Sequence, residues 1–370
     1  MLSPEDAGFV DYRAPDRPGL RLAVKDMVGV EGCLQTAGLA RFATRRAGAD
    51  AAAVTRLRLA GFAVVGSGVT DAAGFGTMTP KLRNPRHPLR AVGGSTGGPA
   101  AAVAAGLADV GLGTDTGGSV RIPAAYCDLY AFKASHGVLP LDGVIPLSPR
   151  FDALGVLAAT PDALKVAISG LCDAPLTPSP DIAIAVDSGA LNANDRAVAG
   201  PFRKLVHCLT PQLLRFPSFE EMAGAHAAVV CRDAAAQYGA DAAAHPGAYP
   251  LAIEGALSLA RRLTTGELAA SDASITTMAA RIRAHLGQRV LLSPTLPILP
   301  APRHAAATTI NGTRVAVTSA NIRNTLIANV AGLPSVVVPL PELSLQVIGP
   351  YESDLWLADA ALAIAARLMR

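Results

Sequence analysis

Two glycine-rich loops early in the chain each carry a serine that could act as a nucleophile. Residues 93–98 read GGSTGG, and residues 113–119 read GTDTGGS. Consecutive glycines let the backbone turn tightly and direct several N–H groups at one point. A serine at the end of such a run would lie beside a ready-made site for an oxyanion. Either loop alone could equally be a tight structural turn, so the surrounding residues must decide.

Three known glycine motifs are alternatives for these loops. The chain has no GxxxxGK[ST] sequence, which excludes a P-loop, and the second loop lacks the third glycine of a dinucleotide fingerprint. Residues 93–97 do match G-x-S-x-G, the nucleophile elbow of α/β-hydrolases, with Ser95 as nucleophile. That elbow should follow a solid strand and needs a downstream acid and histidine. The preceding run is short and starts at Pro88, and no downstream histidine has a distinctive setting.

A neutral lysine could activate a serine without histidine, because burial disfavours the charged form and lowers the lysine pKa. Lys25 directly follows the apolar residues 22–24, which we predict to be part of a buried strand. Lysine is rarely buried. Taken alone, Lys25 would most simply reach solvent from the end of that strand.

Lys25 is part of a longer sequence pattern. AVKDMVGVEG (residues 23–32) and GGSTGGPAAAVAAGLADVGLGTDTGGSVRIPAAY (residues 93–126) together closely resemble the amidase signature family. The resemblance covers residues 20–170 and returns over residues 288–365. It implies an α/β fold: one large domain over residues 1–370, with a mostly mixed central β-sheet covered by helices on both faces. A shortened, variable helical region falls at about residues 172–287.

The resemblance also implies a Ser–Ser–Lys triad. Ser119 would be the nucleophile, Ser95 would bridge through a cis peptide bond after Gly94, and neutral Lys25 would be the final base. The cycle would be acyl transfer: Ser119 attacks an amide carbonyl, an amine leaves, and water hydrolyses the acyl-enzyme.

Further residues around the triad would support it. The oxyanion hole is expected from backbone N–H groups, those of Thr116, Gly117, Gly118 and Ser119. We interpret Asp115 and Arg121 as an ion pair that fixes the glycine loop, and Thr96 as a hydroxyl that supports the relay. No metal, nucleotide or flavin is implied by any motif.

Local patterns predict the elements that would position these residues. We expect strands at residues 21–24, 62–66, 110–113, 290–292 and 335–338, and a hairpin at residues 308–317 that turns at Asn311-Gly312. Helices are expected over residues 51–60 with Asp50 as N-cap, residues 99–106, residues 160–172, most of residues 219–285, and from about residue 353. Residues 172–200, richer in Pro, Asp and Ser, would be a surface excursion.

Composition excludes several classes of protein. The 370 residues are 51% hydrophobic with a net charge of +3 and 4% aromatic residues. This excludes a disordered chain and a dedicated nucleic-acid binder. The uncharged residues 91–108 contain too much glycine to be a membrane span, and the polar N-terminus is no secretory signal. The five widely spaced cysteines favour reduced thiols in a cytoplasmic protein, for which a homodimer remains open.

The substrate is harder to infer than the reaction. Residues 66–72 read GSGVTDA where many relatives read GKTNMDE, and the shortened middle region suggests a small or open site. Arg83, Arg150 and Arg323 are candidates to pair with a substrate carboxylate, although solvated surface positions explain them more simply. The leading hypothesis is an amidase acting on a small carboxamide or urea-like amide.

Three other functions stay open: the ammonia-generating amidase component of a tRNA-dependent amidotransferase, an α/β-hydrolase with a Ser95 nucleophile, and a catalytically idle scaffold. The short chain and the altered residues 66–71 argue against the amidotransferase component. The intact Lys25, Ser95 and Ser119 argue against an idle scaffold.

Overall fold

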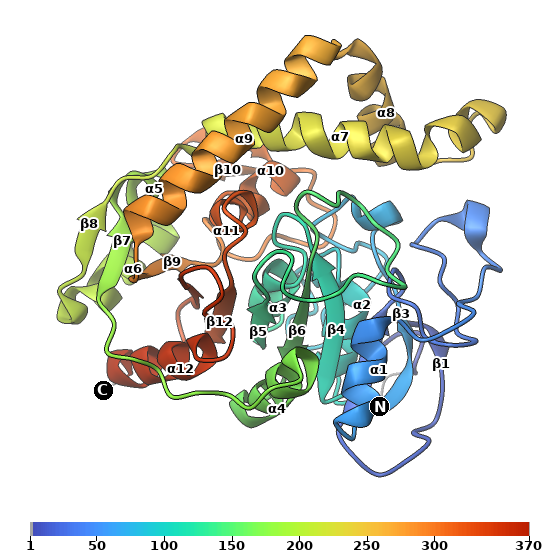
Figure 1. Ribbon diagram of the computed structural model, residues 1–370, viewed down its shortest axis with the longest axis horizontal. Helices are drawn as coiled ribbons and strands as arrows, with labels where there is room; N and C mark the ends of the chain where they lie inside the picture. The colour runs from blue at the N-terminus through green and yellow to red at the C-terminus, as the bar shows by residue number, and fades with distance from the viewer. Residues whose placement is uncertain (1–2, 370) are drawn as a thin grey trace.

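An eleven-stranded sheet forms the centre of the molecule (Figure 1). The computed structural model describes residues 3–369. In spatial order the strands are β1 (Phe9–Tyr12), β3 (Ala63–Gly68), β2 (Arg21–Lys25), β4 (Val110–Asp115), β6 (Ala153–Ala158), β5 (Tyr130–Lys133), β12 (Ser335–Pro339), β13 (Ser344–Ile348), β9 (Val290–Pro294), β7 (Ile184–Asp187) and β8 (Gln212–Leu214). β2 runs parallel to β3 and β4, and β7 runs parallel to β8 and β9, whereas the other neighbours are antiparallel. The sheet is therefore mixed, as the sequence predicts.

Helices of very different lengths surround this sheet. They are α1 (Ala52–Leu59), α2 (Gly97–Ala104), α3 (Arg121–Tyr126), α4 (Pro161–Cys172), α5 (Ser188–Ala193), α6 (Arg196–Val206), α7 (Phe219–Ala244), α8 (Leu251–Arg262), α9 (Thr265–Leu286), α10 (Val317–Ile322), α11 (Leu326–Val330) and α12 (Leu357–Leu368). Short 3-10 turns occur at η1 (Ala40–Phe42), η2 (Ala72–Gly74) and η3 (His207–Leu209). Strands β10 (Ala307–Ile310) and β11 (Thr313–Ala316) form a separate hairpin.

The helices cover both faces of the sheet because successive strand residues point to opposite sides. On β2, Leu22 and Val24 pack in a cluster with α1, α4 and α12, whereas Ala23 between them packs in a cluster with α2 and α3. Figure 1 shows α1, α4 and α12 on one side of the sheet and α7, α9 and α11 on the other. Every residue of β4 and β6 is buried, the pattern typical of strands covered on both faces.

The topology brings the two glycine loops to one place. β2 ends at Lys25, and the parallel β4 beside it ends at Asp115, where the second loop begins. Because parallel neighbours present their carboxyl ends at the same edge, Lys25 and the second loop lie together at the edge where α/β proteins usually bind ligands. α2 begins at Gly97, so the first loop joins them from the N-terminal end of this helix.

Several predicted elements are confirmed. α4 begins at Pro161 with the Thr160 side chain capping Ala163 N, and the three helices α7, α8 and α9 occupy the middle region. The hairpin turn has φ of 49° at Asn311 and 85° at Gly312, two positive values as a type I′ turn requires. No helix within residues 3–369 is long and apolar enough to cross a membrane.

Two local predictions are wrong. Asp50 does not cap α1: Ala51 holds the N-cap position, and the Asp50 carboxylate accepts from Glu31 N and pairs with Arg58. Residues 172–200 are not only a surface excursion, because β7 within them enters the main sheet between β9 and β8. A strand of four residues buries too little apolar sequence to stand out from its polar surroundings.

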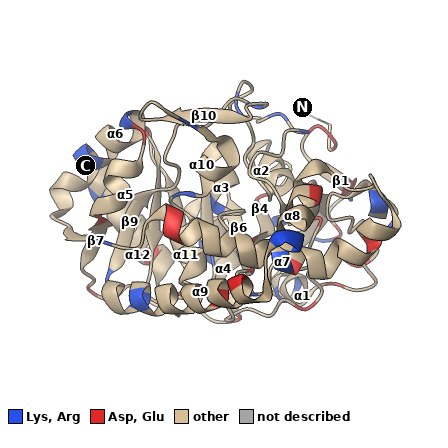
Figure 2. Cartoon of the chain, turned by 90° about the horizontal axis from the view of Figure 1, so that it is seen from above, with Lys and Arg blue, Asp and Glu red and all other residues tan. Residues whose placement is uncertain are grey.

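Charged residues of both signs are scattered over the elements in Figure 2, and neither sign is gathered on one of them. This matches the small net charge of +3. The described cysteines carry free thiols; Cys33, Cys127 and Cys231 are buried and Cys208 is exposed.

The approach of α2 to the sheet generates a prediction about stability. A Cβ at Gly98 would lie 2.2 Å from Val69 N and 2.5 Å from Gly8 O. Backbone atoms cannot move aside as a flexible side chain can, so we expect Gly98→Ala to lower the free energy of unfolding by about 2–4 kcal/mol in urea denaturation.

The matched control is Gly224→Ala on α7, where nothing lies within 4 Å of the added Cβ. This substitution should raise the free energy of unfolding by up to about 1 kcal/mol, since alanine is the better helix former. Equal stability of the Gly98→Ala variant and the unsubstituted chain would contradict the close packing of α2.

Candidate active site

Lys25 is held out of water at the end of β2, with 1% of its surface exposed. Its Nζ lies 2.8 Å from Ser95 Oγ and 2.8 Å from Thr114 Oγ1. Burial lowers the pKa of Lys25 to about 8, although the carboxyl groups of Asp152 and Asp71 oppose this shift. A lysine with this pKa has a neutral fraction near physiological pH, and its nitrogen can then accept a proton from Ser95.

Ser95 is also buried, at 1% exposure, and the Gly94–Ser95 peptide bond is cis. Thr70 Oγ1 donates to Ser95 O at 2.9 Å, which fixes the first loop against the end of β3. Thr96 N donates to Ser119 O at 3.0 Å. This backbone hydrogen bond joins the two glycine loops directly.

Thr96 contacts the second loop and not the two residues of the expected relay. Its hydroxyl lies 3.5 Å from Thr114 O and, among the described residues, forms no hydrogen bond with Lys25 or Ser95. The side chain packs over Gly113, where a Cβ would come within 2.4 Å of Thr96 Cγ2. The hydroxyl that contacts Lys25 belongs to Thr114 instead.

Ser119 lies at the end of the second loop, 7% exposed, and lines a cavity together with Thr116 and Gly117. Within residues 3–369 no hydrogen bond links Ser119 Oγ to Ser95 or to Lys25. The structure thus brings Lys25 and Ser95 into direct contact and places Ser119 beside them at the cavity wall, tied to the first loop through its backbone.

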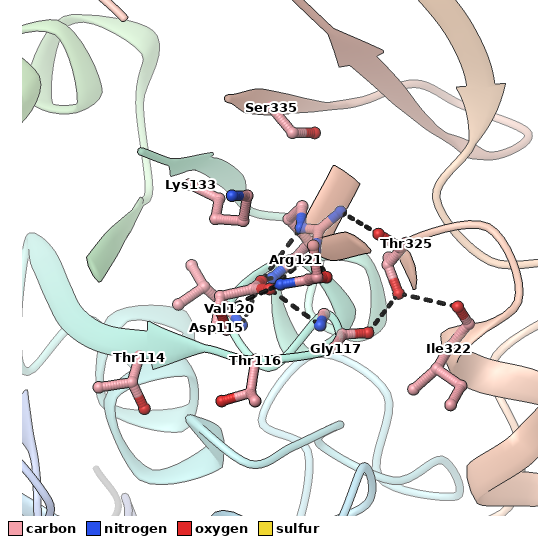
Figure 3. Close-up of polar contacts among 12 residues, drawn as sticks. Thr114, Asp115, Thr116, Gly117, Val120, Arg121, Lys133, Ile322, Thr325 and Ser335 are labelled. Atoms are coloured by element: carbon pink, nitrogen blue, oxygen red, sulfur yellow. Dashed lines mark hydrogen bonds and ion pairs between the residues drawn. The ribbon is translucent and has the colours of Figure 1, made fainter. Parts of the chain in front are cut away.

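Asp115 and Arg121 form an ion pair with no exposed surface on either side chain (Figure 3). Arg121 Nη2 donates to Asp115 Oδ1 at 2.7 Å and Nε donates to Oδ2 at 3.0 Å. Burial alone would raise the pKa of Asp115, but the Arg121 guanidinium holds it far below its usual range. The remaining Arg121 donors reach Thr325 O, Gln346 Oε1 and Asn329 Oδ1.

This carboxylate also changes the expected oxyanion hole. Gly118 N donates to Asp115 Oδ1 at 2.9 Å, and Val120 N donates to Oδ2 at 3.1 Å. The Gly118 N–H is therefore already engaged by Asp115 in the absence of substrate. The N–H groups of Thr116, Gly117 and Ser119 have no acceptor among the described residues.

Neighbouring side chains hold the second loop in shape. Thr325 Oγ1 donates to Gly117 O at 2.6 Å, as Figure 3 shows, and Thr116 Oγ1 donates to Asp152 Oδ1 at 2.6 Å. His226 Nε2 lies 3.1 Å from Thr116 O. Burial raises the pKa of Asp152 to about 6. None of these three contacts was predicted from the sequence, and Thr325 and His226 lie outside every motif considered above.

A cavity of about 450 Å³ opens beside Ser119. Residues of the second loop, of α7, α8 and α10, and of η2 with the segment that follows it form the cavity wall. Most of these lining residues are apolar. The lining side chains of greatest size are Phe75, Leu147, Phe219, His226, Val230 and Ile322. Within residues 3–369, no group of three or more His, Cys, Asp or Glu side chains is placed to hold a metal ion.

The three arginines considered as carboxylate partners do not line this cavity. Arg323 donates to Glu220 Oε1 at 2.9 Å, and its guanidinium lies 4.5 Å from the centroid of the Phe219 ring. Arg150 donates to Thr276 Oγ1 at 2.7 Å, and Arg83 is exposed.

Comparison with known proteins adds to this geometry. A family model described as Amidase matches residues 17–208. The chain is 44% identical over 156 residues, or 41% of its length, to a glutamyl-tRNA(Gln) amidotransferase subunit of Treponema pallidum (strain Nichols). It is 40% identical over 147 residues, or 38% of its length, to indoleacetamide hydrolase of Pseudomonas syringae pv. syringae. These alignments span only 31% and 33% of the respective relatives.

A solved structure is similar to a larger part of the chain than these sequence relatives are. A crystal structure described as that of an amidase superimposes with a TM-score of 0.82 at 26% identity, covering 94% of this chain and 84% of the other. At this coverage the superposition extends well beyond residues 17–208, and it confirms the predicted α/β architecture.

The buried ion pair generates a prediction about stability. Arg121→Met would leave the Asp115 carboxylate buried without its cation, and breaking such a pair typically costs about 3–5 kcal/mol. We expect a loss of this size in urea denaturation at neutral pH. The double variant Asp115→Asn/Arg121→Met should regain part of it, because the unpaired charge is gone.

Lys165→Met serves as the control, since Lys165 and Asp359 form a half-exposed pair with an N–O distance of 3.1 Å. Exposed pairs contribute about 0–1 kcal/mol. If Arg121→Met and Lys165→Met had the same small effect, the central role of the Asp115–Arg121 pair would be refuted.

Proposed function

Because this chain belongs to the amidase family, we propose that it hydrolyses the C–N bond of a small amide through an acyl-enzyme on Ser119. The observation that carries the proposal is the buried contact of 2.8 Å between Lys25 Nζ and Ser95 Oγ, at the edge of the sheet where Ser119 lines a cavity. A lysine with a lowered pKa, a serine in contact with it, a second serine at the cavity wall and free N–H groups are the parts that acyl transfer requires.

In the first step, Ser119 Oγ attacks the amide carbonyl carbon. The Ser119 proton passes to Ser95 Oγ while the Ser95 proton passes to neutral Lys25 Nζ. Catalytic hydrogen bonds are often long before the substrate binds, so the relay closes when Ser119 Oγ comes within hydrogen-bond distance of Ser95 in the complex. The carbonyl electrons move to oxygen, and the N–H groups of Thr116, Gly117 and Ser119 are the available donors to this oxyanion.

In the second step, the tetrahedral intermediate collapses. The C–N bond breaks, and the leaving nitrogen takes a proton that returns from Lys25 through Ser95. Water then attacks the carbonyl carbon of the Ser119 ester, and the same relay accepts its proton. The bond between the carbonyl carbon and Ser119 Oγ breaks, the relay returns the proton to Ser119 Oγ, and the carboxylic acid is released. Each half of the cycle leaves Lys25 neutral again, so histidine is not needed.

A second candidate is supported by the 44% identity to a protein named as part of a glutamyl-tRNA(Gln) amidotransferase. In that case the amide would be glutamine, and the ammonia would pass to a partner protein. Glutaminase activity together with co-purification of a partner would favour it. The α/β-hydrolase alternative is less well supported, because Ser95 is 1% exposed and engaged by Lys25, whereas Ser119 lines the cavity.

Labelling with a serine-reactive fluorophosphonate tests which serine is the nucleophile. We expect a single adduct on Ser119, located by mass spectrometry of a digest, and no adduct in Ser119→Ala. An adduct on Ser95 would overturn the proposed mechanism. Lys25→Met should slow labelling by about 10²–10⁴-fold, the usual contribution of a general base. Lys81→Met, at an exposed position, should label at the normal rate.

The pH dependence of labelling tests the role of Lys25 separately. Burial lowers its pKa to about 8, and only the neutral form accepts a proton. The rate constant should therefore rise about tenfold per pH unit below that value and become constant above it. A rate that falls as the pH rises from 7 to 9 would contradict a neutral lysine base.

A further inference from the structure

We propose that the acyl group accepted by this site is apolar and uncharged, so that the substrate is an aryl or alkyl carboxamide. Glutamine and other amides whose acyl group carries a carboxylate would be excluded. The inference rests on the function proposed above and narrows it, because the acyl group attached to Ser119 must occupy the cavity that Ser119 lines.

The cavity wall has no permanent charge. None of the described residues that line it is Asp, Glu, Lys or Arg. Apart from His226 its large side chains are apolar, and the polar groups belong to the second loop or to small hydroxyl residues. One of these, Thr77 Oγ1, already accepts from Asn321 Nδ2 at 3.1 Å.

The two titratable side chains of the wall besides Ser119 are also neutral. His226 Nε2 lies 3.1 Å from Thr116 O, and its ring lies against Phe151 with a centroid distance of 4.4 Å. A carbonyl oxygen only accepts, so Nε2 carries the proton, and burial lowers the pKa of His226 to about 4. Burial raises the pKa of Cys231, which therefore remains a thiol.

The cations near the wall are already engaged, and Asp152, which accepts from the wall residue Thr116 at 2.6 Å, is itself an anion. Arg323 is bound to Glu220 and stacked on Phe219, and the Phe219 side chain separates it from the cavity beside Ser119. Asp233 is bound to Arg232 at 2.8 Å. A carboxylate group in the cavity would lose its hydration without gaining a counter-charge, which is strongly unfavourable.

The size of the cavity sets a second limit. A volume of about 450 Å³ is near the lower end of ligand pockets, which span about 300–1,000 Å³. It has room for one ring system or a branched chain next to the scissile amide. Apolar walls of this kind bind such groups through burial of apolar surface.

A matched pair of amides tests the inference. Hexanamide and adipamic acid have the same chain length, but one ends in a methyl group and the other in a carboxylate. We expect kcat/KM for ammonia release to be at least about 100-fold higher for hexanamide, and a similar ratio for phenylacetamide over glutamine. Equal or better turnover of adipamic acid or glutamine would overturn the inference.

A covalent probe separates this outcome from failure of the proposed function. A fluorophosphonate with a hexyl chain should label Ser119 at least about 100-fold faster than one with a 5-carboxypentyl chain. If both label Ser119 at similar rates, the apolar specificity is wrong but the nucleophile stands. If Ser119 is not labelled by either and no amide is turned over, the proposed function itself fails.

A charge placed in the wall should change the preference. Ala223 lines the cavity from α7 and is partly exposed, so Ala223→Arg would supply a cation. We expect the ratio of kcat/KM for adipamic acid to that for hexanamide to rise at least about tenfold. Ala236→Arg, on the same helix at an exposed position outside the cavity, should leave the ratio unchanged. If Ala223→Arg does not fold, the comparison of the two fluorophosphonates on the unsubstituted chain still tests whether the site prefers an apolar group.

Discussion

The buried pair between Asp115 and Arg121 is the interaction on which the site depends. Asp115 ends the strand beside Lys25, and its carboxylate accepts from the N–H groups of Gly118 and Val120 as well as from Arg121. Arg121 in turn binds Thr325, Asn329 and Gln346, more than 200 residues further along the chain. The pair therefore shapes the turn that carries Ser119 and connects it to the C-terminal part of the fold. A charge pair without water is stable only when its remaining hydrogen-bonding atoms are satisfied, and these contacts satisfy them.

Burial also affects the protonation of Lys25, the base proposed for this site. Lys25 lies on an interior strand of the sheet, and its side chain is almost fully buried. Among the described residues, its amine contacts two hydroxyl groups and the Thr114 carbonyl oxygen, and buried carboxyl groups lie near it. Burial raises the pKa of Asp71 and Asp152 to about 6. The sheet thus does more than hold the residues in place: by excluding solvent it sets the protonation states that a serine relay needs.

The sequence predicts the parts of this arrangement that depend on continuous apolar strands or on long motifs. Lys25 and Ser95 meet as expected because the strand and both loops lie within such segments. The use of the Gly118 N–H by Asp115 could not be predicted, because it depends on the direction of one side chain. The contact from His226 was missed because a lone histidine on a long helix gives no signal. The strand at residues 184–187 was hidden by polar neighbours, although it lies in the sheet.

The position of α7 has a consequence for how such a protein can change. The Lys25–Ser95 contact and the Ser119 loop come from the first third of the chain, whereas Phe219, Ala223, His226 and Val230 of the cavity wall come from a helix about a hundred residues later. The proposed catalytic residues and much of the wall proposed to select the substrate are thus encoded in separate stretches of sequence. Substitutions in that helix can redirect selectivity while the reactive centre is inherited intact, so divergence in this segment is compatible with an unchanged reaction.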